Sequence, residues 1–472
     1  MPDLADLTAV QQAAAVRDGA VSPVELVEHY LDRIERLDPA VGAFVTVTAD
    51  AAREQAAAAE RRLASGAELP PLFGVPIAIK DLNSTAGVRT TFGSAVYAGH
   101  VPAYDDFVVG KLKAAGTICV GKTNAPEFGL PCYTEPDVAP AARTPWDLRR
   151  SAGGSSGGAA AAVAAGLVPF AHGSDGGGSI RIPASVCGLV GLKTSRGRVS
   201  NGPVMADVTG LAVQGPLART VRDAAALLDA MSGPMPGDPH WANPPSEPYT
   251  VAVERPVGRL RIGRYATPID ASIPVAPECI DAYDEATKVL LALGHEVEDV
   301  PPPFRPEVID QFLDVWAVAA CMTPVPAGAE PLLRPLTRWL RERGRAVSGP
   351  GFATSLAGMQ RQSRAAISAT AGFDAVLTPT LAQPPALVGE LRDDSDPERD
   401  FNRQFGFTPF TAAYNVTGQP AISLPLWRTS AGLPIGVMLA GRPAGEELLL
   451  RLAAQIEDAV GGWARTPELG SS

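Results

Sequence analysis

The sequence is poor in the residues that build disulfide frameworks and metal centres. Its 472 residues include only five cysteines and five histidines, and neither type recurs at a paired spacing. This scatter excludes a disulfide framework and a zinc site, and a reducing cytoplasm is the simplest location for such a chain. A metal ion would have to rest on carboxylates alone, so we expect no metal and no other cofactor.

Positive charge and long apolar runs are also scarce. The net charge of −11 repels phosphate backbones, so nucleic acid is not expected as a direct partner. The most apolar run, residues 159–170, is only about half as long as a membrane-spanning helix. The first residues lack the positive and apolar regions of a secretory signal peptide, and we expect no membrane attachment.

Apolar residues are plentiful, at 46% of the chain, and they predict a large buried core. A strand over 74–80, a helix over 107–115 and a strand over 117–120 follow one another as in a βαβ unit. This order predicts an α/β fold with a largely buried sheet. Periodicity predicts further elements along the chain, with helices near 7–16, 24–37, 282–293 and 446–459 and strands near 260–263, 421–426 and 435–439.

Residues 116–123 fit the P-loop pattern GxxxxGK[ST], which cradles nucleotide phosphates. A P-loop needs a strand before its first glycine and a helix after its threonine. Here the apolar strand lies between the two glycines, and Pro126 disturbs the helix that should follow. The context therefore disfavours a nucleotide site.

Residues 153–157 fit the pattern GxSxG, in which Ser155 would be the nucleophile of an α/β-hydrolase. A nucleophile elbow follows an apolar strand, but residues 146–151 are polar. Such an enzyme also needs a histidine base, and the downstream histidines are isolated, namely His172, His240 and His295. An isolated histidine is more often a core or surface residue, so this alternative is also disfavoured.

Lys80, Ser155 and Ser179 form a third candidate. Three consecutive glycines, Gly176–Gly178, precede Ser179, and glycine lets successive N–H groups point into one concavity, as an oxyanion hole requires. With no suitable histidine, Lys80 at the end of a predicted strand remains as the base, because burial lowers the pKa of a lysine. Asp81 is adjacent, but neighbours on a strand point to opposite faces, so it need not pair with the amine.

Residues 153–158 and 173–181 resemble the amidase signature. Further stretches similar to that family follow in the same order along the chain, at 75–81, 121–128, 215–223, 415–425 and 433–437. The resemblance implies the family fold, a single large α/β domain over residues 1–472 with a central mixed, twisted sheet flanked by helices. Three regions are expected within it: an N-terminal helical region (1–70), a catalytic core (71–233) and a variable cap at the substrate (324–405).

The family has a triad of lysine, cis-serine and serine, whose positions here are Lys80, Ser155 and Ser179. By resemblance, Lys80 is the base, the peptide bond before Ser155 is cis, the Ser155 hydroxyl relays protons, and Ser179 is the nucleophile. The backbone N–H groups expected to hold the oxyanion belong to Gly176, Gly177, Gly178 and Ser179. The residues expected to position this loop are Ser174, Asp175 and Arg181.

The sequence departs from the family pattern at three places. Ser174 stands where the family often has threonine, Thr144 replaces an asparagine, and residues 193–195 are Lys-Thr-Ser instead of Lys-Pro-Thr. A hydroxyl is retained at Ser174, so its role near the base is expected to survive. The other two changes affect loop packing and substrate contacts rather than the triad.

Residues 134–136 and 181–193 are similar to a subgroup of bacterial hydrolases that act on cyclic aminohexanoate dimers. The resemblance implies an amidase that hydrolyses a small linear or cyclic carboxamide, and it leaves a homodimer open. Three residues are candidates for lining the substrate pocket, with ordinary helix packing as the alternative: Leu313, Trp316 and Cys321.

Two other functions stay open at this point. The first is the amidase subunit of a tRNA-dependent amidotransferase, a branch that usually has Tyr-Gly-Arg where residues 195–198 are Ser-Arg-Gly-Arg. The absence of that stretch and the acidic charge favour a stand-alone enzyme. The second is a non-catalytic scaffold with the same fold, which the intact Lys80, Ser155 and Ser179 disfavour.

Overall fold

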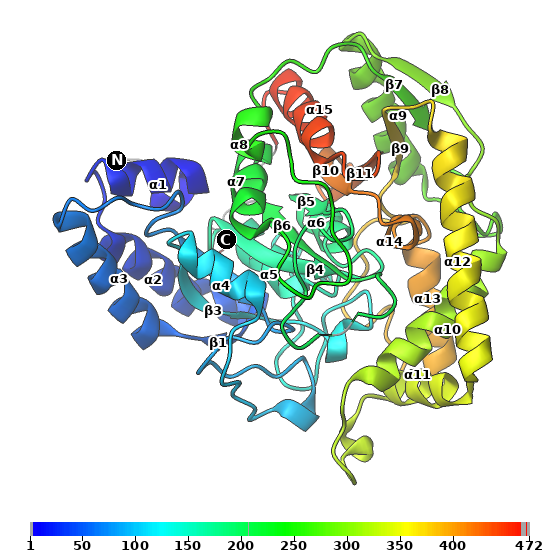
Figure 1. Cartoon of the computed structure of the whole chain (residues 1–472), viewed down its shortest axis with the longest axis horizontal. Helices are drawn as coiled ribbons and strands as arrows, with labels where there is room; N and C mark the ends of the chain where they lie inside the picture. The colour runs from blue at the N-terminus through cyan, green and yellow to red at the C-terminus, as the bar shows by residue number, and fades with distance from the viewer. Residues whose placement is uncertain (1–2, 206, 464–468, 470–472) are drawn as a thin grey trace.

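A computed structural model describes residues 3–205, 207–463 and 469 of the chain (Figure 1). Within these residues one sheet holds eleven strands in the order β1-β3-β2-β4-β6-β5-β10-β11-β9-β7-β8. The strands are β1 (Phe44–Val47), β2 (Pro76–Lys80), β3 (Ile118–Thr123), β4 (Phe170–Asp175), β5 (Val190–Lys193), β6 (Val213–Ala218), β7 (Arg261–Arg264), β8 (Glu296–Asp299), β9 (Ala375–Pro379), β10 (Ala421–Arg428) and β11 (Pro434–Gly441). Strand β2 runs parallel to β3 and β4, and β7 runs parallel to β8 and β9, whereas the other pairs are antiparallel. The sheet is therefore mixed, as predicted.

The helices precede, separate and follow these strands. They are α1 (Ala9–Arg17), α2 (Pro23–Val41), α3 (Ala49–Ala64), α4 (Phe107–Ala114), α5 (Gly157–Ala164), α6 (Arg181–Cys187), α7 (Val221–Met231), α8 (Tyr249–Ala252), α9 (Pro277–Ala292), α10 (Glu307–Met322), α11 (Pro335–Ala346), α12 (Gly349–Thr370), α13 (Pro397–Phe407), α14 (Ala413–Thr417) and α15 (Glu446–Ala459). Short 3₁₀ helices occur at Leu4–Asp6, Ala95–Tyr97, Glu127–Gly129 and Glu330–Leu332.

Side chains of the central strands alternate between two layers of helices. Ile77 and Ile79 of β2 belong to an apolar cluster with α4, α7, α9 and α15, whereas Ala78 between them belongs to a cluster with α2, α5 and α6. Phe170 and Ala171 of β4 divide in the same way. The sheet is thus buried on both faces, which explains why its central strands are apolar throughout.

The N-terminal region is helical, with one exception. Helix α2 begins one residue before the predicted range, where the Ser22 side chain accepts a hydrogen bond from the third helical residue and Pro23 occupies the first position. The exception is the four-residue strand β1, which pairs with the edge of β3 and has no clear pattern in the sequence.

The range predicted for the cap, residues 324–405, does not coincide with one group of helices in the structure. Residues 324–405 contain α11, α12 and α13, but they also contain β9, which is a strand of the central sheet. Helix α10 lies before this range and packs with α11 and α12. We therefore call α10–α13 the cap helices, and Figure 1 shows them at the right of the molecule, with α1–α3 at the left.

The glycine- and alanine-rich helix α5 lies deep in the molecule, and Gly157 to Val163 are all buried. A Cβ on Gly158 would lie 2.4 Å from the backbone nitrogen of Asn124, so only glycine lets the helix approach β3 this closely. Because α5 follows Ser155 directly in the chain, this close packing places that serine at the centre of the fold.

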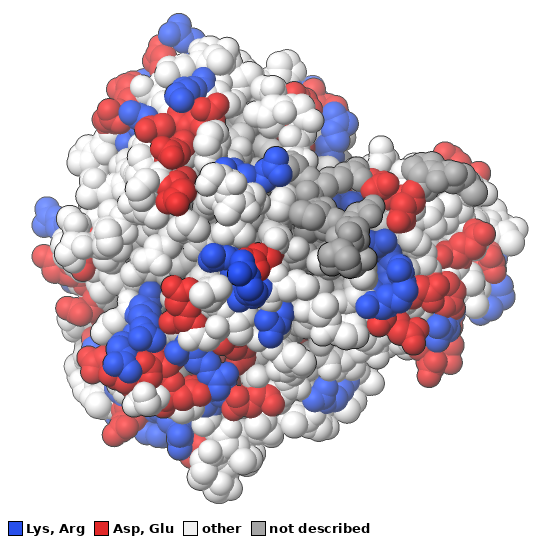
Figure 2. Space-filling view, turned by 180° about the vertical axis from the view of Figure 1, so that it is seen from behind, with Lys and Arg blue, Asp and Glu red and all other residues white. Residues whose placement is uncertain are grey.

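Charged side chains of both signs are interspersed on the face of the molecule shown in Figure 2. In the part of the chain that the structure describes, every helix is too short or too polar to cross a membrane.

Candidate active site

Lys80 ends β2 beside the carboxyl end of β4. Since the two strands run in parallel, the residues that end them meet at one edge of the sheet. The Lys80 Nζ atom lies 2.9 Å from Ser174 Oγ and 3.1 Å from the Ser174 carbonyl oxygen. It also lies 2.8 Å from Ser155 Oγ. The structure thus brings the predicted base, the predicted relay and one predicted supporting residue into direct contact.

The Lys80 side chain is fully buried, and its surroundings favour the neutral amine. Burial lowers the pKa of Lys80 to about 7, against the opposing effect of the Asp175 carboxylate. A neutral amine has two N–H groups and one lone pair. Because the Ser174 carbonyl can only accept, the lone pair must face a hydroxyl. Two hydroxyls are within reach, so Ser155 can donate its proton to Lys80 while Ser174 Oγ accepts an N–H from the amine.

The segment that carries Ser155 is fixed from both sides. The peptide bond between Gly154 and Ser155 is cis, as the resemblance implied. A Cβ on Gly154 would meet neighbouring backbone at 2.8 Å, so glycine is needed there. The Ser156 N–H donates to the Ser179 carbonyl oxygen at 3.1 Å, and the Ser156 hydroxyl donates to the Ser174 carbonyl oxygen at 3.1 Å. These bonds hold the relay next to the candidate nucleophile.

Ser179 lies between the glycine run and α6, at the inner end of a pocket. The residue is 7% exposed, and its hydroxyl forms no hydrogen bond with any other residue that the structure describes. Catalytic hydrogen bonds are often long in unliganded enzymes and tighten when substrate binds. The hydroxyl is therefore accessible from the pocket and uncommitted.

The glycine run before Ser179 forms a turn in which one backbone N–H group is bonded within the protein and others are free to bond a ligand. The Gly178 N–H donates to Asp175 Oδ1 at 2.7 Å, and Gly178 has a φ of 136° that favours glycine. This bond corrects the predicted oxyanion hole, because the Gly178 N–H is already used. Within the described residues, the N–H groups of Gly176, Gly177 and Ser179 have no hydrogen-bond partner.

Asp175 and Arg181 form a fully buried ion pair under this turn. The guanidinium donates to the two carboxylate oxygens at 2.9 and 3.0 Å, and the Ile180 N–H adds a bond at 3.1 Å. Burial alone would raise the pKa of Asp175, but the Arg181 guanidinium outweighs burial and holds it below its usual value. The charged pair therefore stays ionised and fixes the loop that ends at Ser179.

Asn415 also supports this loop, although it was not predicted. Its side-chain N–H₂ donates to the Asp175 carbonyl oxygen at 2.9 Å, and its oxygen accepts from Arg181 at 2.7 Å. Asn415 opens the stretch 415–425 that resembles the family. Its position in that stretch could have marked it as a candidate site residue, but the sequence around it did not indicate that it contacts Asp175 and Arg181.

An open pocket of about 850 Å³, its mouth included, leads from the surface to Ser179. Its walls come from residues 130–132, from the loop and first turn of α6, from α10, and from α13 with the residues that follow it. On α10, Phe312 and Trp316 stack with ring centroids 5.4 Å apart and planes 18° apart, and both face the pocket. Trp316 was predicted to line the pocket, whereas Phe312 was missed.

The other two predicted residues, Leu313 and Cys321, lie outside the lining of this pocket. Leu313 packs against the apolar cluster formed with α11, and Cys321 donates its thiol to the Arg341 carbonyl oxygen at 3.2 Å. Neither lines the pocket, so ordinary helix packing accounts for both. Leu313 is three residues from Trp316 and adjoins it on α10, and both pack against the cluster with α11, but only Trp316 also lines the pocket.

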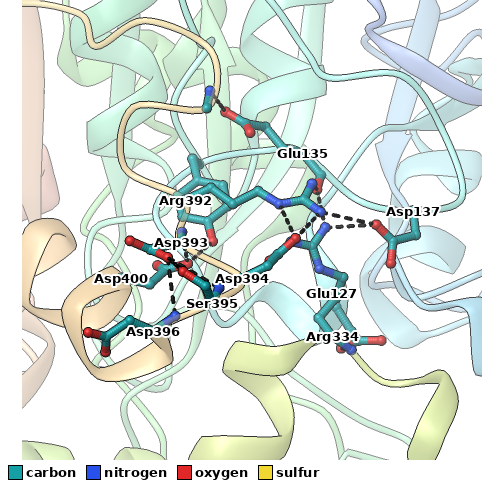
Figure 3. A network of polar contacts seen from close by, with 12 residues as sticks. Glu127, Glu135, Asp137, Arg334, Arg392, Asp393, Asp394, Ser395, Asp396 and Asp400 are labelled. Carbon is teal, nitrogen blue, oxygen red and sulfur yellow. Dashed lines mark hydrogen bonds and ion pairs between the residues drawn. The ribbon is translucent and has the colours of Figure 1, made fainter.

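Arg334, just before α11, joins the cap helices to the catalytic core (Figure 3). Its nearly buried guanidinium donates to Asp137 at 2.8 Å and to Asp394 at 2.6 Å, and its backbone N–H donates to Glu127 at 2.8 Å. Glu127 and Asp137 flank the pocket residues 130–132 in the sequence, and Asp394 lies just before α13. Arg334 therefore connects two of the segments that form the pocket walls, the stretch around residues 130–132 and α13.

The structure does not give the two disfavoured motifs the surroundings that a P-loop or a nucleophile elbow with a histidine base requires. Residues 118–123 of the apparent P-loop form strand β3, and Lys122 is buried with its amine donating to the Asn83 carbonyl oxygen at 2.6 Å. Asp81 lies 3.6 Å from the Lys122 amine and so pairs with it rather than with Lys80. His172, the nearest candidate base for the GxSxG motif, is buried beside Gln214, and burial lowers its pKa to about 3.

Comparison with known proteins identifies the chain. The sequence model of the family described as Amidase matches residues 25–450. This chain belongs to the amidase family. A 6-aminohexanoate-cyclic-dimer hydrolase of Paenarthrobacter ureafaciens is 38% identical to this amidase, over 98% of this chain and 96% of the relative.

Solved structures agree with this assignment. A 6-aminohexanoate cyclic dimer hydrolase complexed with substrate matches with a TM-score of 0.87 and 34% identity, over 97% of each chain. A bacterial aryl acylamidase of the amidase signature family matches with a TM-score of 0.85 and 28% identity, over 96% of each chain. The chain therefore has the amidase signature fold, and it is a hydrolase of amide C–N bonds. Among the described residues, no group of three His, Cys, Asp or Glu side chains is arranged to hold a metal ion.

Proposed function

We propose that this amidase cleaves a small linear or cyclic carboxamide through an acyl-enzyme on Ser179. Lys80 is the base and Ser155 relays the proton. The observation that carries the proposal is the 2.8 Å contact between Lys80 Nζ and Ser155 Oγ, at a buried lysine whose pKa lies near 7. A lysine with that pKa is partly neutral at physiological pH, as a general base must be.

Acylation begins when Ser179 Oγ forms a bond to the carbonyl carbon of the amide. Its proton passes to Ser155 Oγ, while the proton of Ser155 passes to Lys80 Nζ. The carbonyl π electrons move to the oxygen, which becomes an oxyanion. When this intermediate collapses, the C–N bond breaks, and the proton on Lys80 returns through Ser155 to the leaving nitrogen. Water then attacks the Ser179 ester by the same proton path and releases the carboxylic acid.

The oxyanion is proposed to lie against the N–H groups of Gly176, Gly177 and Ser179. Their lack of another partner supports this set, and the bond from Gly178 to Asp175 removes the fourth predicted donor. Removing one such donor from other hydrolases costs about 10²–10³ in kcat. Asp175 thus acts on the hole indirectly, by fixing the turn that presents the remaining donors.

The two alternatives from the sequence are less favoured. The relatives described above are named as hydrolases and as an acylamidase, which supports hydrolysis rather than transfer of ammonia to a tRNA-bound group. The contact between Lys80 and Ser155 argues against a non-catalytic scaffold. The cytoplasmic location and a homodimer stay predictions, and size-exclusion chromatography with light scattering would test the homodimer.

A fluorophosphonate probe tests the proposed nucleophile. We expect the wild-type protein to be labelled, Ser179→Ala to lose all labelling, and Lys80→Met to be labelled very slowly at neutral pH. Lys193→Met is the matched control, because Lys193 is also a buried lysine but donates to the Thr194 carbonyl oxygen rather than to a serine hydroxyl. Persistent labelling of Ser179→Ala would move the nucleophile to another residue.

A further inference from the structure

Among the described residues that line the pocket beside Ser179, none has a charged side chain. Of the described lining residues, four have polar side chains other than an indole: Cys132, Ser179, Gln404 and Thr408. What a pocket recognises depends on which of these groups are free to bond a ligand. Three of the four prove to be satisfied or weak.

The Gln404 side chain is used at both ends. Its oxygen accepts from the Cys132 backbone N–H at 2.8 Å, and its nitrogen donates to Asp400 at 2.6 Å. Asp400 is itself buried and accepts a further bond from the Tyr133 hydroxyl at 2.7 Å. Gln404 therefore holds the pocket wall together, and its polar atoms are committed within the protein.

The other two polar side chains offer little to a ligand. Thr408 donates its hydroxyl proton to the Gln404 carbonyl oxygen at 3.1 Å. Burial raises the pKa of the Cys132 thiol well above its usual value, so this residue stays a neutral, weakly polar group. Ser179 is thus the one strong hydrogen-bonding side chain of this set that remains free.

The stacked rings of α10 face the catalytic loop with carbon atoms. Cζ3 and Cη2 of Trp316 lie 3.1 Å from where a Cβ on Gly176 would be, and Cζ of Phe312 lies 3.5 Å from the corresponding point on Gly177. Cζ3 and Cη2 are on the side of the indole opposite to its N–H group. An apolar aromatic wall therefore lies directly beside the atoms that would hold a reacting carbonyl.

We propose that this pocket selects amides whose acyl group is uncharged and apolar, and that Trp316 and Phe312 determine this specificity. The inference rests on the proposed acyl-enzyme at Ser179. The acyl half is the part concerned, because it alone stays attached to Ser179 after the amine has left. The walls next to that serine must therefore hold it through both steps.

The kcat/KM of the enzyme should therefore depend on the length and the charge of the acyl chain. Each buried methylene should raise kcat/KM by about fourfold until the pocket is filled. A terminal ammonium group would lose its hydration and find no partner in this lining. The kcat/KM of a substrate with such an acyl group should therefore be at least about 50-fold lower than that of an uncharged substrate of the same length.

A series of p-nitroanilides with one leaving group tests the proposal. The acyl groups are acetyl, butyryl, heptanoyl and 6-aminohexanoyl, of which the last two have equal numbers of heavy atoms and differ in charge. We expect kcat/KM to rise from acetyl to heptanoyl and to fall sharply for 6-aminohexanoyl. A flat series, or a 6-aminohexanoyl rate within threefold of the heptanoyl rate, would overturn the inference.

Variants on α10 assign the selectivity to the aromatic wall. Trp316→Ala should reduce the ratio of heptanoyl to acetyl rates at least fivefold, whereas Trp316→Phe should keep most of it. Leu313→Ala is the matched control on the same helix, because Leu313 is not among the residues that line the pocket, and its ratio should be unchanged. An unchanged ratio in Trp316→Ala would also overturn the inference.

Mass spectrometry distinguishes a failure of the specificity proposal from a failure of the proposed acyl-enzyme on Ser179. Acylation of Ser179 by all four substrates at similar rates would leave the proposed function standing and refute the specificity. If none of the four acylates Ser179, both proposals fall.

Discussion

The acid limb of the pH–rate profile depends on Lys80, and the structure predicts how Ser174→Ala moves it. Ser174 Oγ lies 2.9 Å from the Lys80 amine and forms no other side-chain hydrogen bond among the described residues. An ammonium needs this acceptor more than a neutral amine does. Its removal should therefore lower the Lys80 pKa further and let the variant work at lower pH.

The magnitude follows from the burial of Lys80. With a pKa of about 7, kcat/KM of the wild-type enzyme should fall about 50-fold between pH 7 and pH 5. A hydrogen bond to a charged group exceeds one to a neutral group by about 1–1.5 kcal/mol, which corresponds to about one pKa unit. The limb of Ser174→Ala should then lie near pH 6, and its rate should fall only about tenfold over the same range.

The assay is kcat/KM for an uncharged p-nitroanilide from about pH 5 to pH 9, since neither the substrate nor the chromophore titrates there. Lys193→Met is the essential control, because burial lowers the pKa of Lys193 to about 7 as well. The limb must persist in Lys193→Met. The reasoning is refuted if that variant loses the limb, if Ser174→Ala leaves it unmoved, or if the wild-type profile is flat.

Three further changes test the fold around the site. Lys80→Met should abolish turnover but stabilise the protein. The buried lysine destabilises the folded state fully at pH values below its folded-state pKa, and this cost shrinks as the pH rises toward its unfolded-state pKa. In urea unfolding, the gain in free energy of unfolding should therefore be about 2.5 kcal/mol larger at pH 6 than at pH 9. An equal gain at both pH values would contradict the shift. Arg334→Gln should lower the free energy of unfolding by about 2–4 kcal/mol in calorimetry, whereas Arg392→Gln, at the more exposed edge of the same network, should cost about 1 kcal/mol or less; similar losses would refute the burial argument. Gly178→Ala should abolish fluorophosphonate labelling, because its Cβ would meet a side-chain oxygen at 2.4 Å, and Gly177→Ala should keep the native circular dichroism spectrum, since its nearest contact is at 3.5 Å.

The elements nearest the site were predictable because their signals are local. Strand β2 and helix α4 are short apolar segments with a glycine close to one end, and α2 begins with a serine at its N-cap and a proline at its first position. Lys80 was found by elimination of histidine and Ser179 by the glycine run, whereas the relay role of Ser155 came from the resemblance to the family. Their contacts, however, depend on three segments that are far apart in the sequence.

What could not be predicted depends on tertiary contacts. Strand β1 is four residues long and forms because the edge of β3 offers free backbone groups, not because of its own pattern. The Gly178 N–H was expected to face the substrate, but Asp175 turns back to bind it, and no spacing rule fixes that choice. On α10 the choice between Leu313 and Phe312 for the pocket depended on the position of α11, which is known only from the packed structure.

The location of a trapped acyl group tests the central claim most directly. Wild-type protein is mixed with heptanoyl p-nitroanilide, quenched in acid within the first turnover and digested, and the modified peptide is sequenced by mass spectrometry. The account predicts a heptanoyl ester on Ser179, absent from Ser179→Ala and formed far more slowly in Ser155→Ala. An ester on Ser155, or the same rate of acylation in Ser155→Ala, would contradict it.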